Sequence, residues 1–226
     1  MDLRLDERVV LVVGGHGLIG SAVVERLRAE GAVVVPASRH AQDGIVMDAA
    51  SDESVASGLA RIREEHGRLD ALVVAAAPSA RTLDPARNSD PEQVLEAFAA
   101  KTLTFLRLAN AVIPGMVDAG YGRVIGVSGQ NAFLIGNVTG SVRNAALVIA
   151  AKNLADAVAG SGVTVNAVSP GIVVDMPSPD VELGRSGQCT PAQVADLIAF
   201  LASPLAGSIS GESIAVGHRV RGATGL

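Results

Sequence analysis

The chain of 226 residues has very few aromatic side chains. It contains four Phe, no Trp and a single Tyr, Tyr121. Proteins that bind single-stranded nucleic acid stack the bases on aromatic rings, so this composition argues against that class. A reaction that needs a phenol as acid or base would have to use Tyr121, which makes the position of this one residue important.

Other reactive groups are also scarce. The one cysteine, Cys189, has no partner in the chain for a disulfide, and the four histidines show no spacing typical of a metal site. Only two lysines occur, Lys101 and Lys152. The net charge of −5 is opposite to that of most proteins that bind nucleic acid. We therefore expect no metal, no nucleic-acid partner and a reducing compartment.

Long hydrophobic runs are missing as well. No apolar run approaches the roughly 18 residues that a membrane-spanning helix needs. The first eight residues, Met-Asp-Leu-Arg-Leu-Asp-Glu-Arg, are charged and lack the apolar core of a secretory signal. We expect a cytoplasmic protein without a membrane partner.

Short apolar runs alternate along the chain with longer segments of helical periodicity. Strands are expected at residues 9–13, 32–35, 44–47, 71–75, 123–127, 164–168 and 213–216. Helices are expected at residues 18–29, 52–65, 91–117, 141–158 and 190–201, with Ser51, Asp90 and Thr190 as caps. Parallel strands joined by right-handed helical crossovers form a doubly wound sheet with helices on both faces. We predict an α/β fold in which residues 1–226 form one domain around a sheet of about seven strands.

A glycine-rich turn joins the first strand to the first helix. It reads Gly14-Gly15-His16-Gly17-Leu18-Ile19-Gly20. Glycines allow the sharp turn and the close approach of a pyrophosphate, and the free amides at the helix start attract phosphate. The turn therefore indicates dinucleotide binding, and a tight turn without a ligand is the alternative.

The end of the second strand favours NADP(H) over NAD(H). An NAD-binding protein usually carries an acidic residue here, which binds the ribose hydroxyls. This chain has Ser38, Arg39 and His40 instead. Arg39, with Ser38 beside it, can pair with a 2′-phosphate, and a solvated arginine without a ligand is the alternative.

Several segments in order along nearly the whole chain resemble the short-chain dehydrogenase/reductase family. They include the glycine turn, Asp48 after the third strand, Val74-Ala75-Ala76-Ala77 after the fourth, and the segment from Val165 to Gly171. The resemblance implies a Rossmann-type fold and a homodimer or homotetramer, or a hetero-oligomer with a homologue, formed through the helices at 91–117 and 141–158. The cofactor-binding residues that it implies are Gly14, Gly15, His16, Gly17, Leu18, Ile19, Gly20, Ser38, Arg39, Asp48, Ala49, Ala75, Ala76, Pro170, Gly171 and Ile172.

The chain departs from the family at the catalytic positions. The family uses a tyrosine, a lysine four residues later, a serine and a helix asparagine. Counting back from Asn166, the tyrosine position falls on Gly140 and the lysine position on Asn144. The serine position falls on Gly129 and the asparagine position on Lys101. The resemblance therefore implies a divergent member without the usual catalytic residues.

Two further residues bear on the chemistry. Tyr121 precedes the fifth strand, roughly 16 Å from the edge where the ligands of such sheets bind, so we expect a turn residue that cannot replace the catalytic tyrosine. Asp175 stands where the family usually has a threonine near the cofactor, and a carboxylate there would repel phosphate. Cys189 has no nearby base, so we expect no nucleophilic role.

The region of the missing catalytic residues is polar. Its expected lining is Lys101, Ser128, Gln130, Asn131, Asn137, Ser141 and Asn144, with Arg81 and Arg143 nearby. We take Lys101, Ser128 and Asn144 as candidate catalytic residues, because a desolvated lysine can act as an acid or base near neutral pH. The alternatives are a lysine on the helix surface and a serine bonded to the backbone. We expect Arg143 to contact a neighbouring segment or subunit.

Three functions remain open at this stage. The first is an NADP(H)-dependent oxidoreductase that acts on a small carbonyl or alcohol by a tyrosine-independent mechanism. The second is a non-redox enzyme on the same scaffold, such as an isomerase, lyase or cyclase. The third is a catalytically silent subunit, because the fold alone does not decide among these functions.

Overall fold

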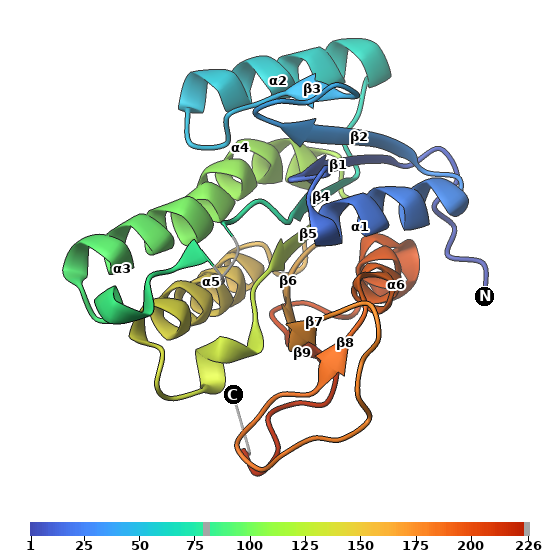
Figure 1. The fold of residues 1–226 in the computed structure, drawn as a ribbon. Helices are drawn as coiled ribbons and strands as arrows, with labels where there is room; N and C mark the ends of the chain where they lie inside the picture. The colour runs from blue at the N-terminus through green and yellow to red at the C-terminus, as the bar shows by residue number, and fades with distance from the viewer. Residues whose placement is uncertain (79–81, 224–226) are drawn as a thin grey trace.

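The computed structural model describes residues 1–78 and 82–223, in which parallel strands form one sheet (Figure 1). Seven strands lie in the order β3-β2-β1-β4-β5-β6-β9. Their bounds are β1 Val9–Val13, β2 Val33–Ser38, β3 Ile45–Val46, β4 Ala71–Val74, β5 Gly122–Val127, β6 Val163–Pro170 and β9 Ser213–Val216. All of the pairings in this sheet are parallel, which confirms the predicted architecture.

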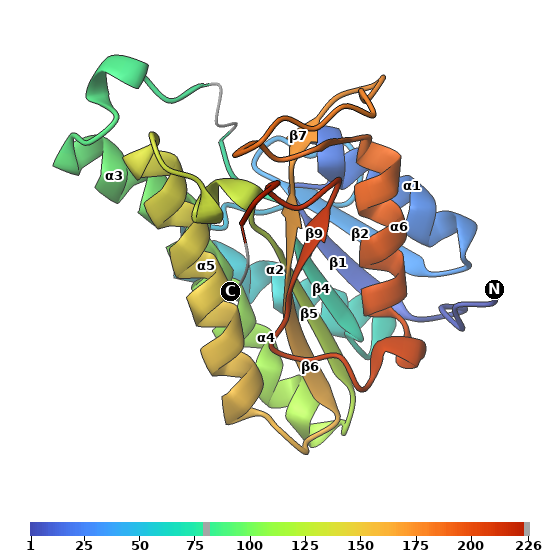
Figure 2. The ribbon, with the colours of Figure 1, turned by 90° about the horizontal axis from the view of Figure 1, so that it is seen from below.

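Helices cover both faces of the sheet (Figure 2). Their bounds are α1 Leu18–Ala29, α2 Asp52–His66, α3 Pro91–Phe98, α4 Thr104–Asp118, α5 Val138–Ala157 and α6 Pro191–Ala202. Side chains of β1 alternate between two cores, because successive residues of a strand point to opposite faces. Val9, Leu11 and Val13 pack in the core with α2, α4 and α5. Val10 and Val12 pack in the core with α1 and α6.

The helix starts follow the predicted capping residues. The side chains of Ser51, Asp90 and Thr190 accept hydrogen bonds from backbone amides of the first turn of α2, α3 and α6. Helix α5 begins at Val138, three residues before the predicted start, because the side chain of Asn137 accepts a hydrogen bond from the Gly140 amide. The prediction of residue 141 as the first helical residue was therefore wrong.

The predicted helix at 91–117 is interrupted by a wider turn. Between α3 and α4 the backbone forms a π-helical segment, η3, over Ala99–Leu103. Such segments occur frequently at functional sites. Lys101 lies in the middle of this segment.

Short elements that the sequence did not predict complete the fold. Their bounds are η2 Pro85–Arg87, η4 Gln130–Phe133, β7 Ile172–Val173, β8 Gln188–Cys189 and η5 Pro204–Ala206. Strands β7 and β8 pair with each other in a small second sheet. Figure 2 shows α3 and the β7–β8 segment beyond the carboxyl ends of the main strands, on either side of the edge where the loops meet.

Tyr121 lies at the opposite edge, directly before β5, as predicted. Its ring packs between the guanidinium groups of Arg8 and Arg123, whose central carbons are 4.2 and 4.4 Å from the ring centre. Its hydroxyl donates a hydrogen bond to the Ala202 carbonyl oxygen, at 3.3 Å. Burial raises the pKa of Tyr121, which further disfavours acid–base chemistry near neutral pH. The residue has a structural role at the amino-terminal edge of the sheet.

The helices of the described residues give no sign of a membrane segment, since none combines the length and the apolar character of a span.

Candidate functional site

A cavity of about 400 Å³ lies at the carboxyl ends of β1, β2 and β4. Parallel strands bring the loops that follow them to the same edge, and ligands of doubly wound sheets bind there. The lining residues are Val13, Gly14, Ser38, Arg39, Met47, Asp48, Ala49, Ala50, Ala76, Ala77, Pro78, Ala100 and Thr104.

Gly14, the first residue of the glycine turn, lines this cavity, and the turn allows very close packing. Gly14 has a φ of +84°, and a Cβ atom there would lie 2.7 Å from the Ala76 amide nitrogen. A Cβ atom on Gly20 would lie 2.0 Å from the Gly14 carbonyl oxygen. Helix α1 begins just beyond, with Gly17 at its cap and no acidic residue in the first turn. Its positive end can therefore accept a phosphate.

Side chains from two other loops face the same cavity. Arg39, directly after β2, is exposed and lies beside Ser38. Asp48 is held in place because its Oδ1 accepts a hydrogen bond from the Ala50 amide and its own amide donates to Ser54 Oγ. The cavity thus contains a guanidinium and an oriented carboxylate, and the positive end of α1 follows Gly14 in the chain.

Part of the predicted cofactor set lines the cavity. The lining members are Gly14, Ser38, Arg39, Asp48, Ala49 and Ala76. The members that do not line it are Gly15, His16, Gly17, Leu18, Ile19, Gly20, Ala75, Pro170, Gly171 and Ile172. Two of these pack closely against other segments. A Cβ atom on Gly15 would lie 2.8 Å from the Pro36 Cβ, and one on Gly171 would lie 2.0 Å from the Gly187 carbonyl oxygen.

Sequence reasoning missed a second group of lining residues. Val13, Met47 and Ala50 are direct neighbours of predicted positions, and Ala77 and Pro78 continue the loop after β4. Ala100 and Thr104 lie one helical turn apart on either side of Lys101 in the sequence. No pattern in the sequence marks this pair as cavity residues, because periodicity gives the faces of a helix and not the neighbour that each face meets.

The three candidate catalytic residues lie close together. The Lys101 ammonium donates a hydrogen bond to the Ser128 carbonyl oxygen, at 2.9 Å, and the Ser128 hydroxyl donates to the Asn144 carbonyl oxygen, at 3.0 Å. All three side chains are buried, so the alternative of a surface lysine is wrong. For Ser128 the structure shows the alternative, a serine bonded to the backbone.

Burial changes the protonation of Lys101. Desolvation, with a smaller contribution from the positive charge of Arg143, lowers the pKa of Lys101 to about 7. Both protonation states are therefore populated near neutral pH, which is the condition for efficient general acid–base chemistry.

The side chain of Asn144 occupies the space beside Gly129. A Cβ atom on Gly129 would lie 3.3 Å from the Asn144 Nδ2. The Oδ1 atom of Asn144 is buried and has no hydrogen-bond partner among the described residues. Gly129 and Asn144 stand at the family's serine and lysine positions. In this structure the side-chain amide of Asn144 therefore lies beside Gly129.

Arg143 is buried next to this group and joins two segments. Its Nη1 donates to the Pro78 carbonyl oxygen, at 3.1 Å, and its own carbonyl oxygen accepts from Thr102 Oγ1, at 3.0 Å. The expectation that Arg143 contacts a neighbouring segment is confirmed. Arg81 lies outside the described residues.

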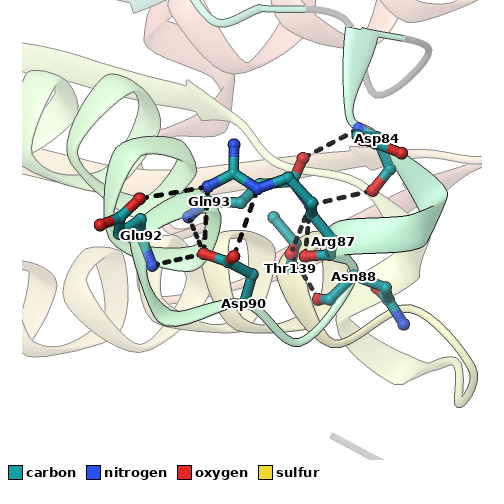
Figure 3. A network of polar contacts seen from close by, with 7 residues as sticks. All are labelled: Asp84, Arg87, Asn88, Asp90, Glu92, Gln93 and Thr139. Carbon is teal, nitrogen blue, oxygen red and sulfur yellow. Dashed lines mark hydrogen bonds and ion pairs between the residues drawn. The ribbon is translucent and has the colours of Figure 1, made fainter.

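A network of polar contacts fixes the start of α5 against the entry to α3 (Figure 3). The Gln93 amide Nε2 donates to the carbonyl oxygens of Asp84 and Arg87 and to Thr139 Oγ1, and its Oε1 accepts from the Asp84 amide. Thr139 in turn donates to the Asn88 carbonyl oxygen through both its amide and its hydroxyl. The helices that carry Lys101 and Asn144 are thereby held in a defined relative position.

The other polar residues of the predicted lining have structural contacts. Asn137 caps α5, and the Ser141 hydroxyl donates to the Leu134 carbonyl oxygen. The Gln130 amide donates to the Val216 carbonyl oxygen, at 3.3 Å. Asn131 is partly buried in η4.

Three observations bear on other kinds of chemistry. Asp175 is exposed and does not line the cavity. Cys189 is buried in β8, where burial raises the pKa of its thiol. The described residues contain no group of three His, Cys, Asp or Glu side chains placed to hold a metal ion.

Comparison with known proteins connects this site to a family. A family model described as enoyl-(acyl carrier protein) reductase matches residues 16–218. The 3-oxoacyl-[acyl-carrier-protein] reductase of Pseudomonas aeruginosa is 31% identical over 252 residues, which cover 95% of this chain and 97% of that protein. The acetoacetyl-CoA reductase of Rhizobium meliloti is 30% identical over 236 residues, which cover 92% of this chain and 95% of that protein.

Solved structures agree in their fold. The crystal structure of gox2181 has a TM-score of 0.81 at 25% identity, and the match covers 95% of this chain and 96% of that one. The ligand-free aldohexose dehydrogenase of Thermoplasma acidophilum also has a TM-score of 0.81, at 22% identity, over 100% of this chain and 99% of that one. The sheet order, the glycine turn at the carboxyl end of β1 and these matches together place the chain in the short-chain dehydrogenase/reductase family of oxidoreductases.

Proposed function

We propose that the protein binds NADP(H) in the cavity and acts as an oxidoreductase on a small carbonyl or alcohol without a catalytic tyrosine. The observation that carries the proposal is the shared cavity of Gly14, Arg39 and Asp48. Ala100, the sequence neighbour of the buried Lys101, lines the same cavity. The names of the relatives describe reductases of 3-oxoacyl and acetoacetyl groups, which supports a carbonyl substrate.

The lining residues and the adjacent start of α1 fit the cofactor. The start of α1 offers backbone amides for the pyrophosphate, and Arg39 offers a guanidinium for the 2′-phosphate. Asp48 is oriented by the Ala50 amide and can accept a hydrogen bond from the adenine amino group. When bound, the reduced cofactor supplies the hydride of the reaction.

The part of this chain in the chemistry is to move a proton at the substrate oxygen. The Lys101 ammonium has three N–H donors and uses one of them on the Ser128 carbonyl oxygen. The remaining donors can bind a substrate oxygen and give it a proton. The family's catalytic tyrosine is absent from this site. Loss of a well-placed acid typically costs a factor of about 10² to 10⁴ in rate, so we expect slow turnover.

Replacement of Arg39 tests the cofactor assignment. The Arg39→Asp variant should bind NADPH at least about tenfold more weakly, because one charge-assisted contact to the 2′-phosphate is lost and a repulsive charge is added. NADH binding should change little. The measurement is a fluorescence titration with both nucleotides, and Arg61→Asp, on the exposed face of α2, is the matched control. Equal NADPH binding by the wild type and Arg39→Asp would show that the assignment is wrong.

A second candidate is a nucleotide-binding subunit without turnover. The Ser128 hydroxyl donates its proton to a hydrogen bond with the Asn144 carbonyl oxygen, so it is not free to donate to a substrate. The proposed proton transfer then depends on Lys101 alone. The decisive measurement is NADPH oxidation with a panel of carbonyl compounds. Binding of NADPH without oxidation by any of them would favour this second function.

The proposal includes a homodimer or homotetramer formed through α3, α4 and α5. Helix α3 exposes Leu95 (64%), α4 exposes Val117 (38%), and α5 exposes Val142 (41%) and Ile149 (63%). Exposed aliphatic side chains on neighbouring long helices are typical of a subunit interface. Sedimentation analysis of the wild type and of Ile149→Glu should show a change in oligomeric state, and a monomeric wild type would refute this part.

A further inference from the structure

The candidate catalytic residues are buried and do not line the cavity. Lys101, Ser128 and Asn144 expose 6%, 6% and 3% of their surfaces. The lining residues of the cavity lie at the ends of β1 to β4 and at Ala100 and Thr104. A substrate oxygen has to touch Lys101 to receive a proton from it, so a segment of the protein has to move before the chemistry can begin.

The short helix η4 closes the carboxyl end of β5 next to these residues. It begins with Gln130, two residues after Ser128. Gln130 exposes 1% of its surface, and its Nε2 donates a hydrogen bond to the Val216 carbonyl oxygen at the end of β9. Gly129 precedes η4, and Gly136, with a φ of +91°, follows it. Glycines on both sides allow η4 to change its position.

Residues 217–223 follow β9 and hold η4 from outside, and we call them the C-terminal strap. The guanidinium carbon of Arg219 lies 5.7 Å from the centre of the Phe133 ring in η4, a distance at which a cation and a ring attract each other. The strap also runs beside residues 181–187, beyond the carboxyl ends of the main strands (Figure 1). It therefore connects η4 to the loop that precedes β8.

Backbone hydrogen bonds join the strap to this loop. The Gly187 amide donates to the His218 carbonyl oxygen, at 2.8 Å. The Gly184 amide donates to the Arg221 carbonyl oxygen, at 2.9 Å, and the Arg221 amide donates to the Arg185 carbonyl oxygen, at 3.0 Å. These bonds give the strap a defined closed position.

Little apolar burial supports that position. Val220 exposes 4% of its surface, whereas the other six residues of the strap are partly or fully exposed. A segment held by exposed backbone hydrogen bonds and few buried apolar side chains opens at a lower free energy than the whole domain. The base of the strap is Gly217, which has a φ of +77°, and a glycine there can absorb the rotation of an opening strap.

We propose that the C-terminal strap is a lid, closed in this structure, that swings about Gly217 to give a substrate access to Lys101. Release of the strap frees η4, which can then move away from the end of β5. The identity of the admitted molecule as a substrate rests on the proposed function, whereas the shielding of Lys101 by the strap does not.

Acetylation of lysine tests this shielding without a ligand. The chain contains two lysines, Lys101 and the exposed Lys152, so peptide mass spectrometry follows each of them separately. The probe is sulfo-N-hydroxysuccinimide acetate at pH 8.5. Acetylation of Lys101 requires the open state, and acetylation of Lys152 is the internal control.

A disulfide between the strap and the loop should lock the lid. Leu183 and Arg221 are partners in a parallel β-bridge, and neighbouring strands lie about 5 Å apart, which a disulfide can span. The native Cys189 is buried and should not interfere. The oxidised Leu183→Cys/Arg221→Cys protein should acetylate Lys101 at least about tenfold more slowly than the reduced protein. Equal acetylation of Lys101 in the two forms would overturn the proposal.

A loosened strap should have the opposite effect. Val220→Ser removes the buried side chain of the strap and should accelerate the acetylation of Lys101 about tenfold. Val46→Ser, at an exposed valine of β3, is the matched control and should behave as the wild type. The melting temperature of each variant separates local release from global unfolding. An unchanged rate at Lys101 in a folded Val220→Ser protein would also overturn the proposal.

NADPH titration and turnover of the double variant separate the two proposals. If NADPH does not bind while the disulfide still slows the acetylation of Lys101, the proposed function fails and the lid stands. If NADPH binds and a carbonyl compound oxidises it equally fast in the oxidised and reduced double variant, the lid fails and the proposed function stands.

Discussion

Burial of Lys101 should make the protein more stable at alkaline pH, and a change to methionine should remove this effect. In the folded protein the pKa of Lys101 is about 7, and in the unfolded chain it returns to 10.5. Between these values the unfolded chain holds a proton that the folded protein has released. The free energy of unfolding therefore increases with pH across this window. From pH 7 to pH 9 the gain is about 2 kcal/mol.

Urea unfolding at several pH values, followed by circular dichroism, measures this effect. Because other groups also titrate, the quantity to compare is the difference between the wild type and Lys101→Met. The wild type should gain about 2 kcal/mol relative to Lys101→Met between pH 7 and pH 9. The matched control is Lys152→Met, since Lys152 is an exposed lysine that pairs with Asp156 on α5. If the free energies of unfolding of Lys101→Met and the wild type change equally with pH, burial does not lower the pKa of Lys101.

Two further substitutions test the glycine turn and the single tyrosine. Gly20→Ala should destabilise the protein by at least about 2 kcal/mol and weaken NADPH binding, because its Cβ would lie 2.0 Å from the Gly14 carbonyl oxygen. A variant with wild-type melting temperature and NADPH affinity would contradict this packing. Tyr121→Phe should lose about 1 kcal/mol with its hydrogen bond to Ala202 and keep any turnover unchanged. Loss of turnover in a folded Tyr121→Phe protein would refute the structural role.

The sequence was a good guide to the fold because the signals for the fold are local. Apolar runs of strand length alternate with helical periodicity, and the caps Ser51, Asp90 and Thr190 stand where the helices begin. The start of α5 was misplaced because Asn137 caps the helix without the flanking signals seen at the other starts. Strands β7 and β8 are two residues long, too short to leave a periodic pattern.

The candidate site was only partly predictable for a related reason. Gly14, Ser38, Arg39 and Asp48 follow strands directly, so their position at the carboxyl edge follows from the parallel sheet. Ala100 belongs to a helix, and which of its faces meets the cavity depends on how the helix packs. Sequence periodicity gives the faces of a helix but does not say which neighbour each face meets.

The sequence by itself determined the α/β architecture, the glycine turn and the scarcity of aromatic residues that leaves Tyr121 as the only phenol. It also placed Tyr121 at the edge of the sheet away from the site. Only the tertiary structure decided that Lys101 is a buried group with a pKa of about 7 and that Arg143 shares its surroundings. The physical reason is that desolvation and unpaired charge depend on atoms that are distant in sequence and meet when the helices pack.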